Sequence, residues 1–232
     1  MDPSQVSSAM SRHRGPSLLA VAIVFTTLFV GSLVISTAMA GGVHFPSPFQ
    51  PEVLSHAYFF QHADAVRVGA FLQFGSAIPL GIFTATAVSR LRFLGVNVAG
   101  GFIALFGGLA ASVFLSLSAL IQWVLSQASD AADSTVHTLH LLAFATGGVA
   151  YVVPVGLLVA GISVTGGLSG LLPKWLMWFG LVVAAVAEVS SLSLLVTPVM
   201  YLLPTARFPA FVWMICVGAL LPKMRGQVAN AR

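Results

Sequence analysis

Charged residues are scarce in this sequence. Asp, Glu, Lys and Arg together make up 7% of its 232 residues, whereas a soluble domain carries roughly 25%. Hydrophobic residues make up 58%. So few charges do not cover a surface that faces water, which excludes a soluble globular protein. The composition therefore predicts an integral membrane protein.

Cysteine pairs and the common catalytic motifs are also missing. The one cysteine, Cys216, lies in an apolar stretch, and a single cysteine excludes an intramolecular disulfide. The sequence contains no His-Glu-x-x-His, no Gly-x-Ser-x-Gly and no phosphate-binding glycine loop. The net charge of +4 is spread along the chain. It therefore does not indicate a nucleic-acid partner.

Long apolar runs are what the sequence has instead. Five stretches reach the roughly 20 apolar residues that a membrane-spanning helix needs, and a sixth reaches that length if its helix begins near Thr205. We expect an all-α, polytopic transmembrane helix bundle with six spans, at residues 17–40, 68–88, 96–125, 136–162, 175–196 and 205–222. Residues 17–222 then form a single transmembrane domain, with tails at residues 1–16 and 223–232.

The basic residues predict an orientation. With six spans, the tails and the second and fourth loops hold all Lys and Arg residues except Arg67 and Arg207. Because membrane proteins concentrate Lys and Arg on the cytoplasmic side, we expect both termini in the cytoplasm. Gln122 and Trp123 then mark the outer membrane interface, where Trp is common.

The first apolar run permits a second interpretation. Basic residues precede it, and Ala38-Met39-Ala40 resembles a signal-peptidase site. The run from Leu18 to Ile35 is longer than the usual signal-peptide core of about 7–15 residues, which favours a retained helix. Cleavage would leave five helices and an outer N-terminus.

A stripe of small residues follows one face of the third predicted span. Its members are four residues apart: Gly100, Ala104, Gly108, Ser112 and Ser116. Small residues let membrane helices approach closely. The stripe predicts a packing surface for another helix, either in this chain or in a partner protein.

One acidic residue, Glu188, lies inside a predicted span. Ionised groups at such depth usually pair with another charge or face a water-filled cavity. The neighbours of Glu188 along the helix are small, which indicates a face that points into the bundle. We expect an outward-facing polar pocket for a small ligand or ion, built from Glu188, Arg67, Arg207, Gln73 and Tyr151. The alternative is a structural ion pair or hydrogen bond through which Glu188 ties the fifth span to the second or the sixth.

A metal site is an alternative on the same side of the membrane. Asp133, His137 and His140 are spaced so that they share one helix face, and these residue types bind divalent metals such as zinc. A fourth ligand would come from the first outer loop, which contains Glu52, His56, His62 and Asp64. No other cofactor is predicted.

The stretch Leu171-Leu-Pro-Lys-Trp-Leu-Met-Trp-Phe-Gly180 carries a resemblance. It is similar to a signature at the start of the fifth helix in a broad group of uncharacterised bacterial six-helix membrane proteins. The resemblance implies a multi-pass protein of the bacterial cytoplasmic membrane. It implies no reaction and no catalytic residue.

Three functional hypotheses follow from the sequence. The first is a non-enzymatic membrane protein that binds a small ligand or ion for transport or sensing. The second is a metal-dependent membrane enzyme that uses Asp133, His137 and His140. The third is a structural subunit whose small-residue stripe packs against another protein.

Overall fold

The computed structural model describes residues 12–128 and 130–224, so the remainder of both predicted tails, including Arg225 and Arg232, lies outside it. The described elements are helices, apart from an isolated bridge between Arg12 and Met224. Their bounds are α2 (Leu18–Met39), α3 (Glu52–Gln61), α4 (Ala63–Phe93), α5 (Ala99–Leu125), α6 (Asp133–Gly147), α7 (Val149–Leu168), α8 (Lys174–Val189), η1 (Ser190–Leu194), η2 (Thr197–Tyr201) and α9 (Leu202–Leu220).

Six stretches of the described chain are long and apolar enough to cross a membrane. They are Leu18–Met39, Ala63–Phe93, Ala99–Leu125, Asp133–Leu168, Lys174–Leu194 and Thr197–Leu220. The predicted all-α polytopic bundle and its count of six spans are therefore confirmed. The short sixth segment reaches a spanning length because α9 already begins at Leu202, before the expected Thr205, and the 3₁₀ helix η2 leads directly into it.

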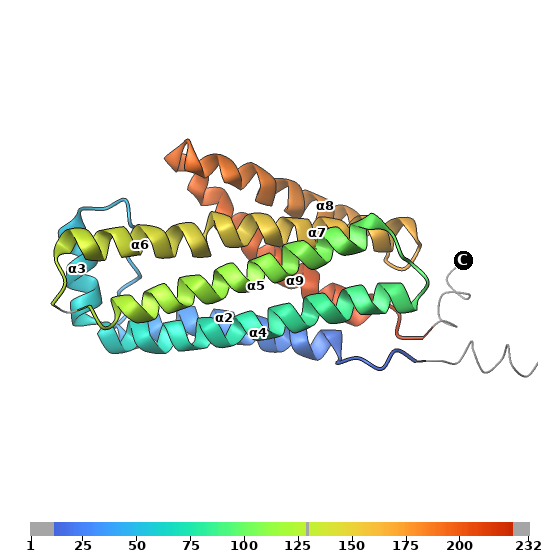
Figure 1. The fold of residues 1–232 in the computed structure, drawn as a ribbon, viewed down its shortest axis with the longest axis horizontal. Helices are drawn as coiled ribbons and strands as arrows, with labels where there is room; N and C mark the ends of the chain where they lie inside the picture. The colour runs from blue at the N-terminus through green and yellow to red at the C-terminus, as the bar shows by residue number, and fades with distance from the viewer. Residues whose placement is uncertain (1–11, 129, 225–232) are drawn as a thin grey trace, which may run out of the picture.

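The six spans run alternately up and down, so the described chain begins and ends at the same end of the bundle (Figure 1). We call this the terminal end, which carries Arg12 and Met224. The opposite end, where α3 lies across the bundle, is the α3 end. Tight turns at the terminal end use Gly95 and Gly170, whose positive φ values of 91° and 68° suit glycine.

Two features of the fold were not predicted from the sequence. The first loop contains a helix of its own, α3, which packs against α6. The fourth span is broken into α6 and α7 at Gly148, whose φ and ψ of −89° and −101° depart from helical values. At the break, the carbonyl oxygen of Gly147, the last residue of α6, contacts Arg207 of α9.

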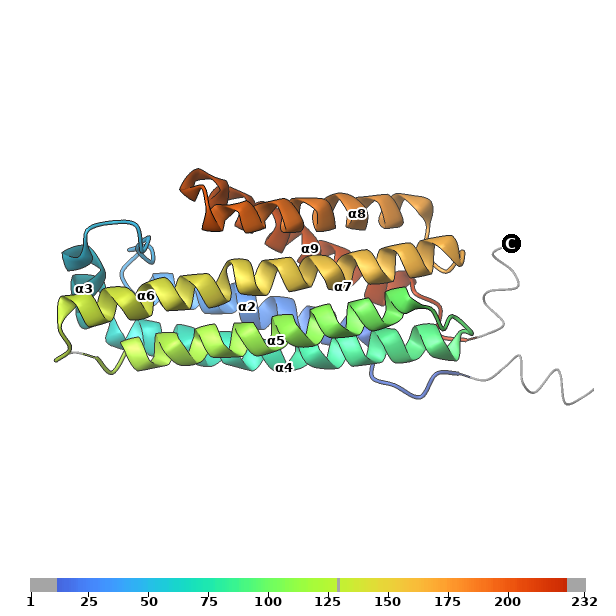
Figure 2. The ribbon, with the colours of Figure 1, turned by 45° about the horizontal axis from the view of Figure 1, so that its top comes forward.

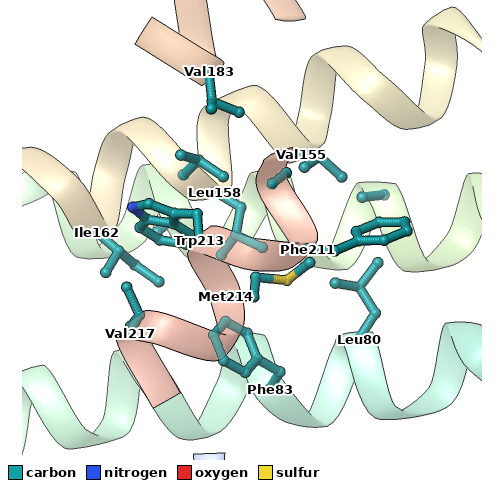
Figure 3. Close-up of a cluster of buried hydrophobic side chains, with 14 of the residues drawn as sticks. Leu80, Phe83, Val155, Leu158, Ile162, Val183, Phe211, Trp213, Met214 and Val217 are labelled. Atoms are coloured by element: carbon teal, nitrogen blue, oxygen red, sulfur yellow. The ribbon is translucent and has the colours of Figure 1, made fainter. Parts of the chain in front are cut away.

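The main core lies where α9 crosses the interior. Trp213 and Met214 of α9 are fully buried between Phe83 of α4 and Leu158 of α7 (Figure 3). In Figure 2, α8 lies on one side of the bundle, against α7 and α9. This arrangement leaves α9 with contacts to α2 on one side and to α7 and α8 on the other.

The small-residue stripe of α5 packs against helices of the same chain. A Cβ on Gly161 of α7 would lie 2.5 Å from the carbonyl oxygen of Gly100. A Cβ on Gly108 would overlap Thr84 of α4, and Ser112 Oγ donates a hydrogen bond to the carbonyl of Ala77, 2.7 Å away. In the structure, the helices that the stripe accommodates are therefore α4 and α7.

Candidate functional site

A cavity of about 230 Å³ lies in the half of the bundle nearer the α3 end. It is enclosed by α2, α4, α5, α6, α9 and the loop between α2 and α3. Its wall consists of Phe29, Ser32, Leu33, Ser36, Thr37, Phe45, Pro46, Pro48, Gly69, Gln73, Ser118, Gln122, His140, Ala143, Phe144, Gly147, Gly148, Leu203 and Arg207. The cavity therefore combines one permanent cation with several neutral polar groups.

Arg207 of α9 is the cation in this wall. Its Nη2 donates a hydrogen bond to the carbonyl oxygen of Gly147, the last residue of α6. Its guanidinium carbon lies 5.5 Å from the centre of the Phe29 ring and 5.3 Å from that of Tyr151, in cation–π geometry. Its Nε is buried and has no hydrogen-bond partner. Within the described chain, no carboxylate lies within 4.0 Å of this guanidinium.

The break between α6 and α7 explains how Arg207 is held. The last carbonyl groups of a helix have no partner within that helix, and Gly147 occupies such a position. Gly148, which also lines the cavity, precedes the first residue of α7. The partly positive N-terminus of α7 therefore lies at the cavity wall as well.

Two glutamine amides, those of Gln73 and Gln122, form another part of the wall. Gln122 Nε2 of α5 donates to Gln73 Oε1 of α4 at 3.0 Å, and it lies 3.3 Å from Ser118 Oγ. Ser118 Oγ donates in turn to the carbonyl of Ala143 at 2.9 Å. A Cβ on Gly147 would overlap the Ser118 hydroxyl and would lie 3.9 Å from Gln73 Nε2. The Gln73 amide and the Arg207 guanidinium therefore both lie close to Gly147 at the cavity wall.

A cluster of aromatic rings lies at the α3 end of the cavity, and two of its members, Phe45 and His140, line the cavity. Phe45 of the α2–α3 loop lies 5.4 Å from the ring centres of Tyr58, Phe59 and His140, each in edge-to-face geometry. His140 is 1% exposed, and its Nδ1 lies 3.1 Å from Ser55 Oγ of α3. These contacts join α3 and the preceding loop to α6. We call Phe45, Tyr58, Phe59 and His140 the aromatic cap.

The structure brings together three of the five residues predicted for the polar pocket. Arg207 and Gln73 line the cavity, and Tyr151 lies beneath the Arg207 guanidinium. Glu188 and Arg67 lie outside the wall. Glu188 is exposed near the end of α8, with Oε1 3.5 Å from the position of a Cβ on Gly156 of α7.

Arg67 instead lies beside a second hollow. It donates to Asp64 Oδ1 at 3.1 Å, and its side chain borders an apolar hollow of about 600 Å³ between α4 and α5. The hollow includes the exposed rings of Phe71 and Trp123. The hollow shares no lining residue with the cavity that contains Arg207.

The predicted metal ligands do not converge on one point, and their side chains have different surroundings. Asp133 Oδ1 lies 2.9 Å from His56 Nδ1, an ion pair when His56 is protonated. His140 faces Ser55, and the buried Nδ1 of His137 has no hydrogen-bond partner. Within residues 12–128 and 130–224, no group of three or more His, Cys, Asp or Glu side chains is placed to hold a metal ion.

Some cavity residues were missed or misplaced by the sequence reasoning. Gln122 was assigned to the membrane interface because it precedes Trp123, and the structure places its amide in the wall beside Gln73. Gly147 carried no signal as a binding residue. The Gly-Gly pair at 147–148, within a predicted span, is the sequence feature that corresponds to the break.

The arrangement provides donors that converge on a small space in the membrane-spanning part of the protein. A guanidinium, a glutamine amide and a helix N-terminus all favour a negatively charged or oxygen-rich group. Comparison of the chain with protein-family models, with curated proteins and with solved structures finds no match. The resemblance of residues 171–180 therefore stays a prediction, and the chain is described by its architecture, a multi-pass bundle of six long apolar helices.

Proposed function

We propose that this protein is a non-enzymatic receptor or carrier of the membrane that binds a small organic anion in the cavity around Arg207. The observation that carries the proposal is the cation itself. Arg207 lies in a candidate membrane span, lines a cavity and has no carboxylate partner in the described chain. Charged residues inside membrane spans are costly and usually mark a substrate or ion pathway.

The chemistry of the wall favours a carboxylate or a similar oxyanion. A guanidinium binds a carboxylate through two parallel hydrogen bonds, and Arg207 uses its Nη2 for the Gly147 carbonyl while its Nε has no partner. Gln73 contributes a neutral donor from α4. Broken helices with their N-termini at the ligand are a recurring arrangement in membrane transporters, and the α6–α7 break is of this kind.

The orientation is part of the proposal. The described basic residues at the terminal end are Arg12, Arg14, Arg90, Arg92, Lys174 and Lys223. Their excess supports a cytoplasmic terminal end, and the resemblance of residues 171–180 supports a bacterial cytoplasmic membrane. The cavity would then lie in the outer half of the bilayer.

A thermal-stability screen of the purified full-length protein tests the proposal. Small carboxylates, sulfonates and phosphates are compared with amines and neutral amides of similar size. A ligand that binds the folded state raises the free energy of unfolding by about 2.7 kcal/mol at 100 times its Kd. We expect stabilisation by one class of anion and none by the amines.

The Arg207→Gln variant provides the residue-level test. Loss of the charged hydrogen bonds is expected to weaken anion binding about 10- to 100-fold. Arg92→Gln is the matched control, because Arg92 also lies over an aromatic ring, 5.1 Å from the centre of Phe102, but at the terminal end. Equal anion binding by wild type and Arg207→Gln would reject the proposal.

The metal-dependent enzyme of the sequence analysis is examined in the same preparation. Elemental analysis compares wild type with the His137→Ala/His140→Ala double variant. About one zinc, iron or copper ion per chain, lost in the double variant, would replace the anion proposal with the metal hypothesis.

A further inference from the structure

The side chains that line the cavity differ in how far they are exposed at the protein surface. Among the described residues that line it, the two exposed side chains are Leu33 of α2 and Phe45 of the α2–α3 loop, at 42% and 41%. Both are apolar. The polar members, Arg207 and Gln73 among them, are buried or partly buried. The cavity is therefore polar in its depth and apolar at its rim.

The α3 end of the cavity is covered. Two members of the aromatic cap, Phe45 and His140, line it there, and Pro48 of the α2–α3 loop is buried in the wall. Next to the cap, the Phe49 ring lies 5.4 Å from the ring of Phe144 of α6. A ligand that came from the aqueous phase at this end would have to move Phe45, whose ring packs against three other rings.

The side of the cavity between α2 and α9 is different. Nearer the terminal end, these helices are joined by rings, with Phe211 4.9 Å from Phe25 and 5.0 Å from Phe29. α9 then runs obliquely to α2 (Figure 1). One turn beyond Phe29, Leu33 is exposed. Since Leu18–Met39 is a candidate span, this exposed side chain faces the lipid in a membrane.

The size of the cavity limits what it encloses. Sites that enclose a drug-sized ligand have volumes of about 300–1,000 Å³, and this cavity has about 230 Å³. Leu33 is four residues from Phe29, about 6 Å along the helix. If the charged head of a ligand lies beside Arg207, the apolar chain of that ligand therefore reaches the rim of the cavity within a few carbon atoms.

From these observations we infer that the ligand is a single-chain amphiphile with an anionic head, which reaches Arg207 sideways from the bilayer between α2 and α9. The inference rests on the proposed function, because it assumes that Arg207 binds the head. It adds the class of ligand and the route. The head lies with Arg207 and Gln73, and the chain passes Leu33 into the lipid.

A series of acetate, octanoate and dodecanoate tests the ligand class. Each is titrated against the full-length protein in nanodiscs of neutral phosphatidylcholine. Affinity is expected to rise about fourfold for each methylene group that the protein buries, and to level off once the chain projects beyond the rim. Dodecanol and dodecyltrimethylammonium have the same chain without the negative charge. Each should bind wild type no better than it binds Arg207→Gln.

The outcomes separate the inference from the proposed function. If acetate binds as tightly as dodecanoate and Arg207→Gln weakens both, the inference that the ligand is an amphiphile is rejected. The proposal that Arg207 binds an anion is then retained. Carboxylate binding that Arg207→Gln does not change would reject the anion site and the inference together.

Larger side chains at the rim of the cavity test whether the ligand enters between α2 and α9. Leu33→Trp is expected to slow the association of dodecanoate severalfold. Val34→Trp is the matched control, because Val34 is the next residue, is 61% exposed and does not line the cavity. Leu33→Phe adds less bulk and serves if the Trp variant does not fold. Equal association rates in the Leu33 and Val34 variants would overturn the lateral route.

Discussion

The guanidinium of Arg207 on α9 donates a hydrogen bond to the carbonyl oxygen of Gly147, where α6 ends. One contact thus joins the broken fourth span to the sixth. The Arg207 guanidinium forms no ion pair with a carboxylate of the described chain. The rings of Phe29 and Tyr151 and a neutral carbonyl hold the cation in place, and none of them cancels its charge.

Arg207→Met is expected to separate binding from stability. Removing the charge relieves its desolvation cost, while Gly147 loses a hydrogen-bond donor, which costs about 1–3 kcal/mol. Because the two effects oppose each other, the free energy of unfolding without ligand should change by about 1 kcal/mol or less. Stabilisation by anions should disappear. Denaturant titrations in detergent micelles with and without ligand measure both quantities. A loss of more than about 3 kcal/mol without ligand would identify Arg207 as a structural tie.

Gly147→Ala is expected to destabilise the protein. The added Cβ would overlap Ser118, and overpacking of this kind costs typically 1–3 kcal/mol. Gly31→Ala is the matched control, because a Cβ at Gly31 on α2 meets nothing within 4 Å. The control should be neutral or stabilise by up to about 1 kcal/mol. Thermal unfolding of both variants gives the comparison, and equal melting temperatures would contradict the tight approach of α5 to the α6 terminus.

Cysteine labelling tests the orientation. In a Cys216→Ser background, Gln50→Cys places a thiol in the α2–α3 loop and Asn97→Cys places one in the α4–α5 turn, both at exposed positions. A membrane-impermeant maleimide applied to intact bacterial cells should label the Gln50 variant only. The Asn97 variant should react after permeabilisation. The opposite pattern would place the terminal end outside.

The terminal end should respond to pH through His13. Burial and the nearby Arg90 guanidinium lower the pKa of the His13 imidazole below its ordinary value of 6.5. The unfolded chain then binds the proton more readily than the folded protein. The free energy of unfolding is therefore unaffected by protonation of His13 above pH 6.5. It decreases as the pH falls from 6.5 through the lower pKa that His13 has in the folded protein.

Melting temperatures at about pH 8 and about pH 5 check this expectation. Wild type should lose more stability on acidification than His13→Asn. His44→Asn, which removes an exposed imidazole at the α3 end, should behave like wild type. An identical pH response of wild type and His13→Asn would show that His13 does not contribute.

The six spans were predictable because lipid imposes a simple length and composition on a crossing helix. The α2–α3 loop was harder. Residues 52–61 are mixed in polarity and begin after a proline, and their helix forms where it packs on α6. Packing of this kind depends on tertiary neighbours that a local pattern does not reveal.

Glu188 shows why the predicted pocket was only partly assembled. Its small neighbours do mark a helix contact, since Ala184 and Ala187 are buried and a Cβ on Gly156 of α7 would lie 2.8 Å from Ala187 Cβ. At 3.6 residues per turn, however, Glu188 lies beside that contact and is exposed. Small residues indicate close packing of backbones and do not by themselves place the next side chain inside.

The decisive features of the cavity depend on a break that hydropathy does not detect. Residues 136–162 read as one continuous apolar run, yet Gly148 interrupts the helix and directs the Gly147 carbonyl to Arg207. Arg207 itself was predicted because it is one of two basic residues available to pair with Glu188 on the outer side. The roles of Gln122 and Ser118 in the cavity wall depend on how α4, α5 and α6 pack together, which the sequence did not reveal.

The most direct test is the stoichiometry of carboxylate binding to the full-length protein in nanodiscs, measured by calorimetric titration for wild type, Arg207→Gln and Arg92→Gln. The account predicts about one ligand per cavity for wild type and Arg92→Gln, with binding lost or weakened about 10- to 100-fold in Arg207→Gln. Identical titrations for wild type and Arg207→Gln would contradict the account.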